Sequence, residues 1–265
     1  MDYITATATH SYLEQPLRQI GEELVEGEAH CGNEVRKWRG LGYHGKSAGS
    51  ASFGVGPQGV LVRASSGLAS DHWRTLAHWS TNVTRLDVQV TLSVGPKATD
   101  FITNKWGEAR QHWLAHKHLA EPRLRSGVNG AETIELGSRQ SERCGRIYDK
   151  FKETKLDHYR GCVRFEAEFK GGVSKAVTSD LLRKPLAPTY VIPYVLGFFH
   201  KQRIGLELST HAPAFIKGPS NVSDRGRKLL YLEKSIRPLV MRLIETGDLG
   251  EVIAALGLND VVTRP

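Results

Sequence analysis

The sequence predicts an α+β fold, in which a twisted antiparallel β-sheet has helices packed on one face and polar side chains on the other. Four segments alternate apolar and polar residues with a period of two, at 84–92, 133–138, 143–151 and 162–171. Such alternation places successive side chains on opposite faces of a strand. Segments with helical patterning precede, separate and follow these strands, a mixture that favours helices packed on a sheet.

The composition is that of a globular protein that attracts polyanions. The chain has 265 residues, of which 40% are apolar and 24% charged, and its formal net charge is +8. A surplus of this size favours acidic partners without specifying which. The cysteines Cys31, Cys144 and Cys162 have neither zinc spacing nor the even number of a disulfide framework. The sequence shows no signal peptide and no apolar stretch that would span a bilayer, so we expect a cytoplasmic protein with no membrane partner.

The first half of the chain is expected to contain two helices, a hairpin and one strand. A helix is predicted around 17–25. The segments SASFGV and GVLVRAS flank the turn sequence VGPQG and predict a hairpin. A Ser-Asp pair before HWRTLAHWS predicts a helix over 70–80, and the strand at 84–92 follows it. We expect no internal repeat.

The second half begins with a helix predicted over 100–120. Residues 121–131 then form a loop that carries Arg123 and Arg125, and the three remaining strands follow this loop. Residues 190–208 are apolar with mixed periodicity and receive no assignment.

Composition divides the chain into three expected parts. Residues 1–39 form an N-terminal lead-in, and residues 40–185 form the core that carries the chemistry. The proline-rich segment KPLAP marks the boundary with a C-terminal part over 186–265. A strong amphipathic pattern over 227–247 predicts a closing helix in that part.

The four alternating segments give the sheet an apolar face and a polar face. The apolar face is predicted to pack in the core, with Leu86, Val88, Val90, Leu92, Ile134, Leu136, Ile147, Phe151, Val163, Phe165, Ala167 and Phe169. The polar face carries Asp87, Gln89, Glu135, Arg146, Tyr148, Lys150, Arg164, Glu166 and Glu168. Carboxylates, cations and a phenol on one surface are suited to holding and cutting a phosphodiester.

Four carboxylates of this polar face are candidate ligands for a divalent metal. Mg²⁺ and Mn²⁺ prefer oxygen donors and keep several waters, so two or three carboxylates suffice. Such an ion neutralises charge that develops on a phosphoryl oxygen. In the alternative, outward carboxylates on half-buried strands are simply solvated. The candidates are Asp87, Glu135, Glu166 and Glu168.

Tyr148 is the candidate nucleophile, because Arg146 and Lys150 flank it on the same face. A phenol with an unperturbed pKa near ~10 is a poor nucleophile at neutral pH, but neighbouring cations are expected to favour the phenolate. Arginine also holds phosphate through two parallel hydrogen bonds. In the alternative, Tyr148 is an ordinary strand tyrosine. Tyr159, in the connection between two strands, is the competing nucleophile.

The order and spacing of these motifs resemble the replication initiation factor family. Its members are rolling-circle Rep proteins of the plasmid Rep_trans type, with relatives in filamentous phages and in relaxases of integrative elements. The family carries R-[ILV]-D, G-S-[RK]-x-S, [RF]-x-Y-[DE]-K and R-[FV]-E-x-E segments. The matching stretches here are Arg85–Leu86–Asp87, Gly137–Ser138–Arg139–Gln140–Ser141, Arg146–Ile147–Tyr148–Asp149–Lys150 and Arg164–Phe165–Glu166–Ala167–Glu168.

The resemblance covers roughly residues 40–245 and has one departure. Family members often have a second aspartate two to four residues after the first. Gln89 and Thr91 stand at those positions here, so the ligand set for a metal is open.

The resemblance implies site- and strand-specific nicking of a replication origin. Tyr148 would attack the scissile phosphate and stay joined to the 5′ end, with Mg²⁺ or Mn²⁺ bound by Asp87 and the strand glutamates. Covalent linkage conserves the phosphodiester energy, so the nick can be resealed. The origin DNA is the implied partner; a host helicase and a homodimer are left open. Phosphates would be held by Arg139, Arg146, Lys150 and Arg164, and DNA by the loop arginines Arg123 and Arg125.

Three other functions compete with this one. A conjugative relaxase would use the same chemistry in another biological setting. A non-enzymatic DNA-binding regulator on the same fold is favoured by the missing second aspartate and disfavoured by the retained tyrosine and carboxylates. A metal-dependent hydrolase that activates water would survive Tyr148→Phe, whereas an initiator would not.

Overall fold

The computed structural model describes residues 1–9, 11–127, 130–184 and 188–206. The chain divides into two compact units, Met1–Gly218 and Pro219–Pro265, and the fold below is that of the first. The closing helix expected over 227–247 lies outside the described residues.

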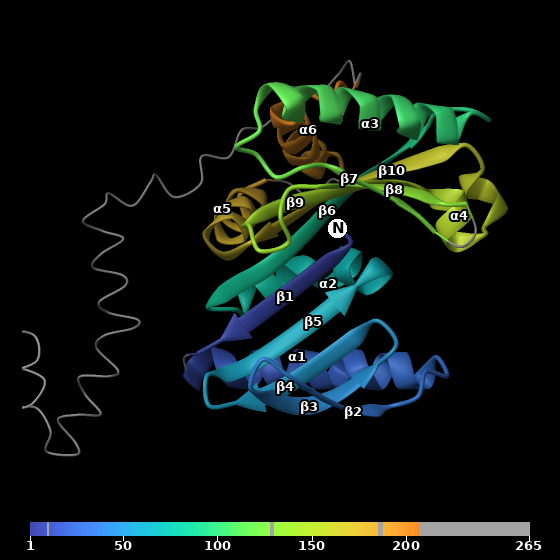
Figure 1. Cartoon of the computed structure of the whole chain (residues 1–265). Coiled ribbons are helices and arrows are strands. Elements are labelled where there is room, and N and C mark those ends of the chain that lie inside the picture. Colours follow the sequence, from blue (N-terminus) through green and yellow to red (C-terminus); the bar gives the residue numbers. More distant parts are fainter. Residues whose placement is uncertain (10, 128–129, 185–187, 207–265) are drawn as a thin grey trace, which may run out of the picture. The chain divides into compact units, whose positions relative to one another are not determined.

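A single antiparallel sheet of ten strands organises the described residues, and it is strongly twisted (Figure 1). The strand order is β2-β3-β4-β5-β1-β6-β10-β9-β8-β7. The strands are β1 (Tyr3–Ala8), β2 (Arg36–Gly40), β3 (Tyr43–Ala48), β4 (Ala51–Gly56), β5 (Gly59–Ser65), β6 (Asn82–Ser93), β7 (Arg123–Ser126), β8 (Glu132–Leu136), β9 (Arg143–Asp149) and β10 (Cys162–Lys170). The α+β class and the antiparallel sheet predicted from the sequence are therefore confirmed.

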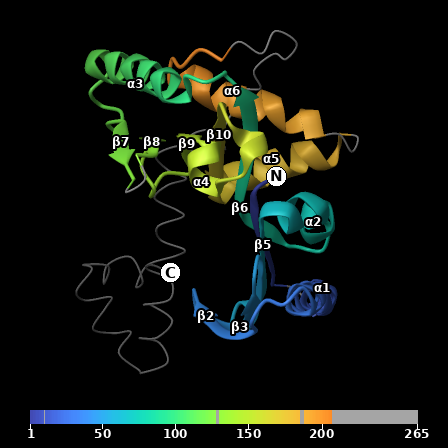
Figure 2. The same cartoon turned by 90° about the vertical axis from the view of Figure 1, so that its right-hand side faces the viewer.

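Helices cover the apolar face of this sheet. They are α1 (Ser11–His30), α2 (Ser66–His78), α3 (Ala98–Ala115), α5 (Gly171–Leu182) and α6 (Ile192–Lys201). The short helix α4 (Lys150–Thr154) and the 3-10 turn η1 (Asp157–Tyr159) lie in the connection between β9 and β10, and a second 3-10 turn, η2 (Pro188–Val191), precedes α6. α1 packs on β4 and β5, α2 on β5 and β1, α3 on β8 and β9, and α5 and α6 on β6 and β10. In Figure 2, α1, α2 and α5 lie on the same side of the strands.

One apolar core lies between the sheet and these helices. Phe165 on β10 is fully buried there, with its ring centroid 6.2 Å from that of Phe101 on α3 and 5.2 Å from that of Phe199 on α6. Strand residues that the period-two pattern assigned to the core share it, including Leu86, Val88, Ile134, Ile147, Val163, Ala167 and Phe169. Burial of this surface is the main force that holds the polar side chains in place on the opposite face.

The sheet is built from two halves with the same topology. The N-terminal half is β1-α1-β2-β3-β4-β5-α2, and the C-terminal half is β6-α3-β7-β8-β9-β10-α5 with α4 and η1 inserted between β9 and β10. Read from the outer edges, the strand orders β2-β3-β4-β5-β1 and β7-β8-β9-β10-β6 correspond strand for strand. β1 and β6 pair antiparallel where the halves meet.

Backbone conformation repeats at equivalent points of the two halves. Ser65 and Lys170 end the fifth strand of each half with φ, ψ of −132°, 166° and −127°, 165°. The next residues, Ser66 and Gly171, both have positive φ, at 53° and 54°. No internal repeat is visible in the sequence, because the duplication lies in backbone topology while the side chains on the polar face differ.

Three further expectations differ from the structure. Residues 1–39 were expected to be a lead-in, but β1 lies at the centre of the sheet and α1 covers part of its apolar face. Part of the segment expected as a loop over 121–131 forms the edge strand β7. The strand predicted over 143–151 ends earlier, at Asp149, and Lys150 and Phe151 belong to α4. The Asp149 carboxylate accepts a hydrogen bond from Lys152 N at 3.0 Å and caps this helix.

Candidate active site

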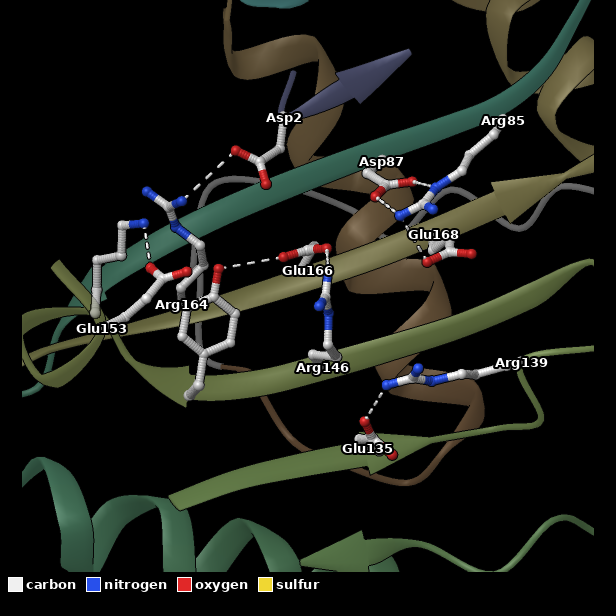
Figure 3. Close-up of polar contacts among 12 residues, drawn as sticks. Asp2, Arg85, Asp87, Glu135, Arg139, Arg146, Glu153, Arg164, Glu166 and Glu168 are labelled. Carbon is white, nitrogen blue, oxygen red and sulfur yellow. Dashed lines mark hydrogen bonds and ion pairs between the residues drawn. The ribbon is translucent and has the colours of Figure 1, made fainter. Parts of the chain in front are cut away.

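The polar side chains of β6, β10 and β9 meet on the uncovered face of the C-terminal half. Antiparallel register places Asp87 opposite Glu168 and Gln89 opposite Glu166 on the first pair of strands. On the second pair it places Glu166 opposite Arg146 and Arg164 opposite Tyr148. Residues directly opposite each other on one face lie about 4.5–5.5 Å apart at Cβ. The structure therefore brings Asp87, Glu166, Glu168, Arg146 and Tyr148 together, as Figure 3 shows for the labelled members.

Asp87 is a deeply buried carboxylate of the cluster and is held by Arg85. The aspartate is 1% exposed, and Arg85 donates from Nε to Oδ1 at 2.9 Å and from Nη2 to Oδ2 at 2.6 Å. Burial raises the pKa of Asp87 to about 7, although Arg85 opposes the rise. The negative charges of Glu168 and Glu166 raise it further.

Glu168 connects this ion pair to the end of β10. Its Oε2 lies 3.0 Å from Arg85 Nη2, and its Oε1 lies 2.6 Å from Lys170 Nζ. On β9, Cys144 lies opposite Glu168 of β10, and burial raises the pKa of the Cys144 thiol to about 11. The thiol therefore stays protonated at neutral pH and is a poor nucleophile.

Glu166 lies between a cation and the candidate nucleophile. One of its oxygens, Oε1, accepts a hydrogen bond from Arg146, and the other, Oε2, accepts one from the Tyr148 hydroxyl at 3.2 Å. The glutamate is 1% exposed. A single buried carboxylate thus contacts both Arg146 and Tyr148 of β9; Figure 3 shows Glu166 beside Arg146.

Tyr148 is buried, and its pKa is raised, mainly by loss of solvent and then by the charges of Glu166 and Glu153. The sequence analysis expected the flanking cations to favour the phenolate. That expectation was wrong for the unbound protein, because Arg146 is paired with Glu166 and Lys150 with Glu153. The phenol needs a proton acceptor in order to react, and Glu166 is the group in contact with it.

Lys150 lies between the two candidate tyrosines. Its Nζ is 5.9 Å from the ring centroid of Tyr148 and 5.8 Å from that of Tyr159. Tyr159 belongs to η1 in the insertion between β9 and β10, and within the part of the chain that the structure describes it makes no hydrogen bond to a carboxylate of the cluster. Tyr148 alone of the two contacts Glu166 directly.

Arg164 is buried beside the cluster and is occupied by the protein itself. Its Nε donates to Thr91 Oγ1 at 3.1 Å, and its Nη1 lies 3.7 Å from Asp2 Oδ1. Asp2 immediately precedes β1, so Arg164 ties the start of the N-terminal half to β10. Arg164 is 7% exposed, so the phosphate contact that the resemblance implies for it would require its side chain to leave Thr91 and Asp2.

Glu135 stands apart from the other carboxylates. On β8 it lies opposite Arg146 on one side and Arg123 on the other, and its oxygens contact Arg125 Nε at 2.9 Å and Arg139 Nη2 at 2.7 Å. These two arginines outweigh burial and lower the pKa of Glu135.

A cleft of about 710 Å³ opens between this outer group and the carboxylate cluster. Its walls come from β6, β7, β8, β9 and β10 and from the segments before β7 and after β8. They include Arg85, Glu121, Arg123, Glu135, Ser138, Arg139, Cys144, Arg146, Glu166, Glu168 and Lys170. Cations and carboxylates alternate along the cleft, as a site that binds both phosphate and a metal cation requires.

The donors fit a divalent cation, though they are not assembled around one. Within the described ranges, no group of three or more His, Cys, Asp or Glu side chains is gathered tightly enough to hold a metal ion. Arg85 and Arg146 instead neutralise the three carboxylates of β6 and β10.

Gln89 adds an oxygen that sequence reasoning did not assign to the site. Its Oε1 is buried and accepts no hydrogen bond from the described residues, although it lies opposite Glu166. An unsatisfied buried acceptor costs about 1–3 kcal/mol, which a bound cation would offset. The signal in the sequence was its position two residues after Asp87, where the resembling family often has a second aspartate.

Comparisons with known proteins agree with the fold. A solved structure, that of a rolling circle replication initiator protein from Geobacillus stearothermophilus, superposes with a TM-score of 0.52 at 16% identity. The match covers 74% of this chain and 83% of that one. This chain shares the fold of a replication initiator. No protein-family model and no curated protein sequence matches it. Among the described helices, none is both long and apolar enough to cross a membrane.

Proposed function

We propose that this protein is a rolling-circle replication initiator that nicks and rejoins one strand of DNA through Tyr148. The observation that carries the proposal is the contact between the Tyr148 hydroxyl and Glu166 within a cluster of carboxylates and arginines. The shared fold with a replication initiator supports it. A conjugative relaxase would use the same residues in the same way.

The proposed reaction is an exchange of one phosphodiester for another. The Oη of Tyr148 attacks the scissile phosphorus, and the bond from phosphorus to the 3′ oxygen breaks. The phenolic proton passes to Glu166 Oε2, which accepts the hydrogen bond in the unbound protein, and the leaving 3′ oxygen takes up a proton from water. The products are a 5′-phosphotyrosyl linkage and a free 3′-OH, and reversal of the step reseals the strand.

A divalent ion, Mg²⁺ or Mn²⁺, is proposed to bind beside the nucleophile. Asp87, Glu168 and Glu166 would hold it together with the orphaned Oε1 of Gln89. When bound, the ion supplies positive charge at the phosphoryl oxygens. Glu135 is a weaker candidate than the sequence suggested, because Arg125 and Arg139 occupy both of its oxygens.

The arginines of the cleft are proposed to bind the DNA backbone. Arg139, 74% exposed at its side chain, and Arg125, 56% exposed, can turn from Glu135 toward a phosphate. Arg123 lines the same cleft on β7, and Lys150 lies beside Tyr148. The substrate proposed is origin DNA; a helicase and a second copy of the chain are expected from the family resemblance alone.

A nicking assay with Mn²⁺ tests the proposal on single-stranded and supercoiled DNA from the genetic element that encodes the protein. Wild type is compared with Tyr148→Phe and Tyr159→Phe on a denaturing gel that resolves protein–DNA adducts. We expect an adduct with wild type and Tyr159→Phe and none with Tyr148→Phe. Cleavage by Tyr148→Phe without an adduct would instead indicate a hydrolase, and binding without cleavage by wild type would indicate a regulator.

A further inference from the structure

The two halves of the sheet carry opposite chemistry on equivalent strands. Strands β1 to β5 contain no aspartate or glutamate, whereas β6 to β10 contain Asp87, Glu132, Glu135, Asp149, Glu166 and Glu168. The five strands of the N-terminal half instead hold the cations Arg36, Lys37, Arg39, Lys46 and Arg63. Glu34, just before β2, pairs with Arg36, but the other four cations of these strands pair with no carboxylate among the described residues, so they favour an anionic ligand.

The duplication shows what replaces the active-site residues. Arg63 lies three residues before Ser66 and opposite Thr5, as Glu168 lies three residues before Gly171 and opposite Asp87. Thr5 and Arg63 therefore stand where the C-terminal half has two carboxylates. By the same register, Leu61 replaces Glu166 and Gly54 replaces Arg146. The N-terminal half therefore has the same strand arrangement but lacks the proposed catalytic side chains.

Trp38 fills the space that these small residues leave. It lies on β2 opposite Gly45, which lies opposite Gly54, so all three share the face that bears Arg63. A Cβ placed on Gly54 would come within 2.8 Å of Trp38 Cζ3, and one on Gly40 within 3.2 Å of Cζ2. The indole thus lies against bare backbone, and its residue stays partly exposed.

Arg63 is the cation next to this ring and has no polar partner among the described residues. Its Cζ lies 4.9 Å from the Trp38 ring centroid, and its Nε is buried without a hydrogen-bond acceptor. A guanidinium stacked beside an indole still offers its outer N–H groups to phosphate. An aromatic ring beside a guanidinium with free donors is the pair that single-stranded nucleic acid uses for stacking and backbone contact.

We propose that Trp38 and Arg63 bind a single strand of DNA next to the nicking site, with a base stacked on Trp38 and a phosphate held by Arg63. The inference rests on the proposed function in taking DNA as the substrate. Both sites lie on the same face of one continuous sheet, with β5 four strand spacings from β9. At about 4.8 Å per spacing, β5 and β9 are about 19 Å apart across the sheet. The register places Arg63 level with Lys170, at the opposite end of β10 from Arg164, the partner of Tyr148, so a DNA strand that contacts both sites runs across the sheet and along it.

The occupant is a single strand and not a duplex, because only unpaired bases expose their ring faces to a protein aromatic. Duplex DNA offers phosphates to Arg63 but no base face to Trp38. The two forms of DNA therefore make different predictions for Trp38, and a binding experiment separates them.

The experiment measures binding of a fluorescein-labelled oligothymidine strand to the full-length protein by anisotropy, in the Tyr148→Phe background so that no DNA is cut. We expect Trp38→Ala to weaken binding about 5- to 100-fold and Trp38→Tyr to retain most of it. Arg63→Gln is expected to weaken binding and to reduce the slope of log affinity against log salt by about 0.7. Binding of a labelled duplex should change little with Trp38→Ala.

Arg39→Gln is the matched control. Arg39 directly follows Trp38 on β2 and is exposed. Because side chains alternate along a strand, Arg39 lies on the face opposite Trp38 and should not contact DNA bound there. Thermal unfolding of each variant shows whether the strand remains folded. Equal binding by Trp38→Ala and Arg39→Gln, or equal losses for single strand and duplex, would overturn the inference.

The outcome is separable from that of the proposed function. An adduct formed by the wild-type protein together with unchanged binding by Trp38→Ala would support nicking and overturn the Trp38–Arg63 site. Loss of strand binding in Trp38→Ala without any adduct in the wild type would support the site and overturn the nicking reaction.

Discussion

Tyr148 donates its phenolic hydrogen to Glu166 Oε2 at 3.2 Å, while the other oxygen of Glu166 accepts a hydrogen bond from Arg146. Burial and nearby negative charge raise the pKa of Tyr148, so the unbound protein holds the phenol protonated. The carboxylate of Glu166, which accepts this hydrogen bond, is also placed to remove the phenolic proton. DNA that draws Arg146 toward a phosphate would free Glu166 to act as a base.

Glu166→Gln should slow adduct formation about 100- to 10,000-fold, since a positioned general base contributes a factor of this size. The amide keeps the shape of the side chain but cannot accept the proton as a carboxylate does. Rapid-quench, single-turnover kinetics with a labelled strand measures the rate. Glu135→Gln is the control, because Glu135 is paired with two arginines away from Tyr148. A wild-type rate for Glu166→Gln would show that Glu166 is not the base.

Asp87 should make the unbound protein less stable as the pH rises from about 4 to about 7. Its pKa is about 7 in the folded chain and 3.8 when unperturbed, so the unfolded chain loses this proton first. The free energy of unfolding then falls with pH over that window, by roughly 4 kcal/mol at most, and levels off above it. Urea unfolding in the presence of EDTA, at several pH values, measures the effect.

Asp87→Asn serves as the comparison, since the variant has no carboxyl to titrate at this position. The difference in stability between wild type and Asp87→Asn should shift in favour of the variant as the pH rises. A difference that stays constant from pH 4 to pH 8 would contradict the raised pKa.

Gln89→Leu should weaken Mn²⁺ binding by about 10-fold or more, since it removes an oxygen donor without adding charge. The apolar side chain also removes the unsatisfied buried oxygen, so the metal-free protein should be as stable as wild type or more stable. Isothermal titration calorimetry and unfolding in EDTA measure the two effects. Equal Mn²⁺ affinity in both proteins would exclude Gln89 as a ligand.

Gly145→Ala should destabilise the protein by about 1–3 kcal/mol, because the added methyl overpacks the core behind the site. A Cβ at this position would come within 2.4 Å of Phe198 Cε1 and 2.8 Å of the carbonyl oxygen of Glu166. Denaturant unfolding measures the loss. Gly107→Ala in α3 is the control: its Cβ meets nothing within 4 Å, and it should stabilise the helix by about 0.5–1 kcal/mol.

The strands predicted from alternation are those with one apolar face and one polar face, and the hairpin of β4 and β5 was predicted from its turn. β6, β8, β9 and β10 alternate cleanly, because each has one face on the core and one face polar. β2 was missed because it is an edge strand with exposed polar residues on both faces. β3, next to it, was missed because Gly45 and Ser47 interrupt any apolar alternation. β1 was missed as well, although it is central, since its polar face holds small threonines that give a weak pattern.

Within the candidate site, the sequence named most residues but not their partners. The alternation placed Tyr148, Arg146, Glu166 and Asp87 on one face, and the structure agrees. The pairing of Arg85 with Asp87, the orphaned oxygen of Gln89 and the burial of Arg164 came only from the fold. These depend on neighbours far apart in the chain, which local patterning does not specify.

By itself, the sequence determined which side chains share the polar face, because the period of a strand is a local property of the backbone. The tertiary structure alone decided that Glu166 contacts both Tyr148 and Arg146, that Asp87 is buried enough to raise its pKa, and that two like-folded halves join at β1 and β6. Strand order and desolvation depend on non-local pairing and packing. They bring the polar residues of β6, β9 and β10 together as a candidate active site and place the proposed DNA-binding residues Trp38 and Arg63 on the same face of the sheet.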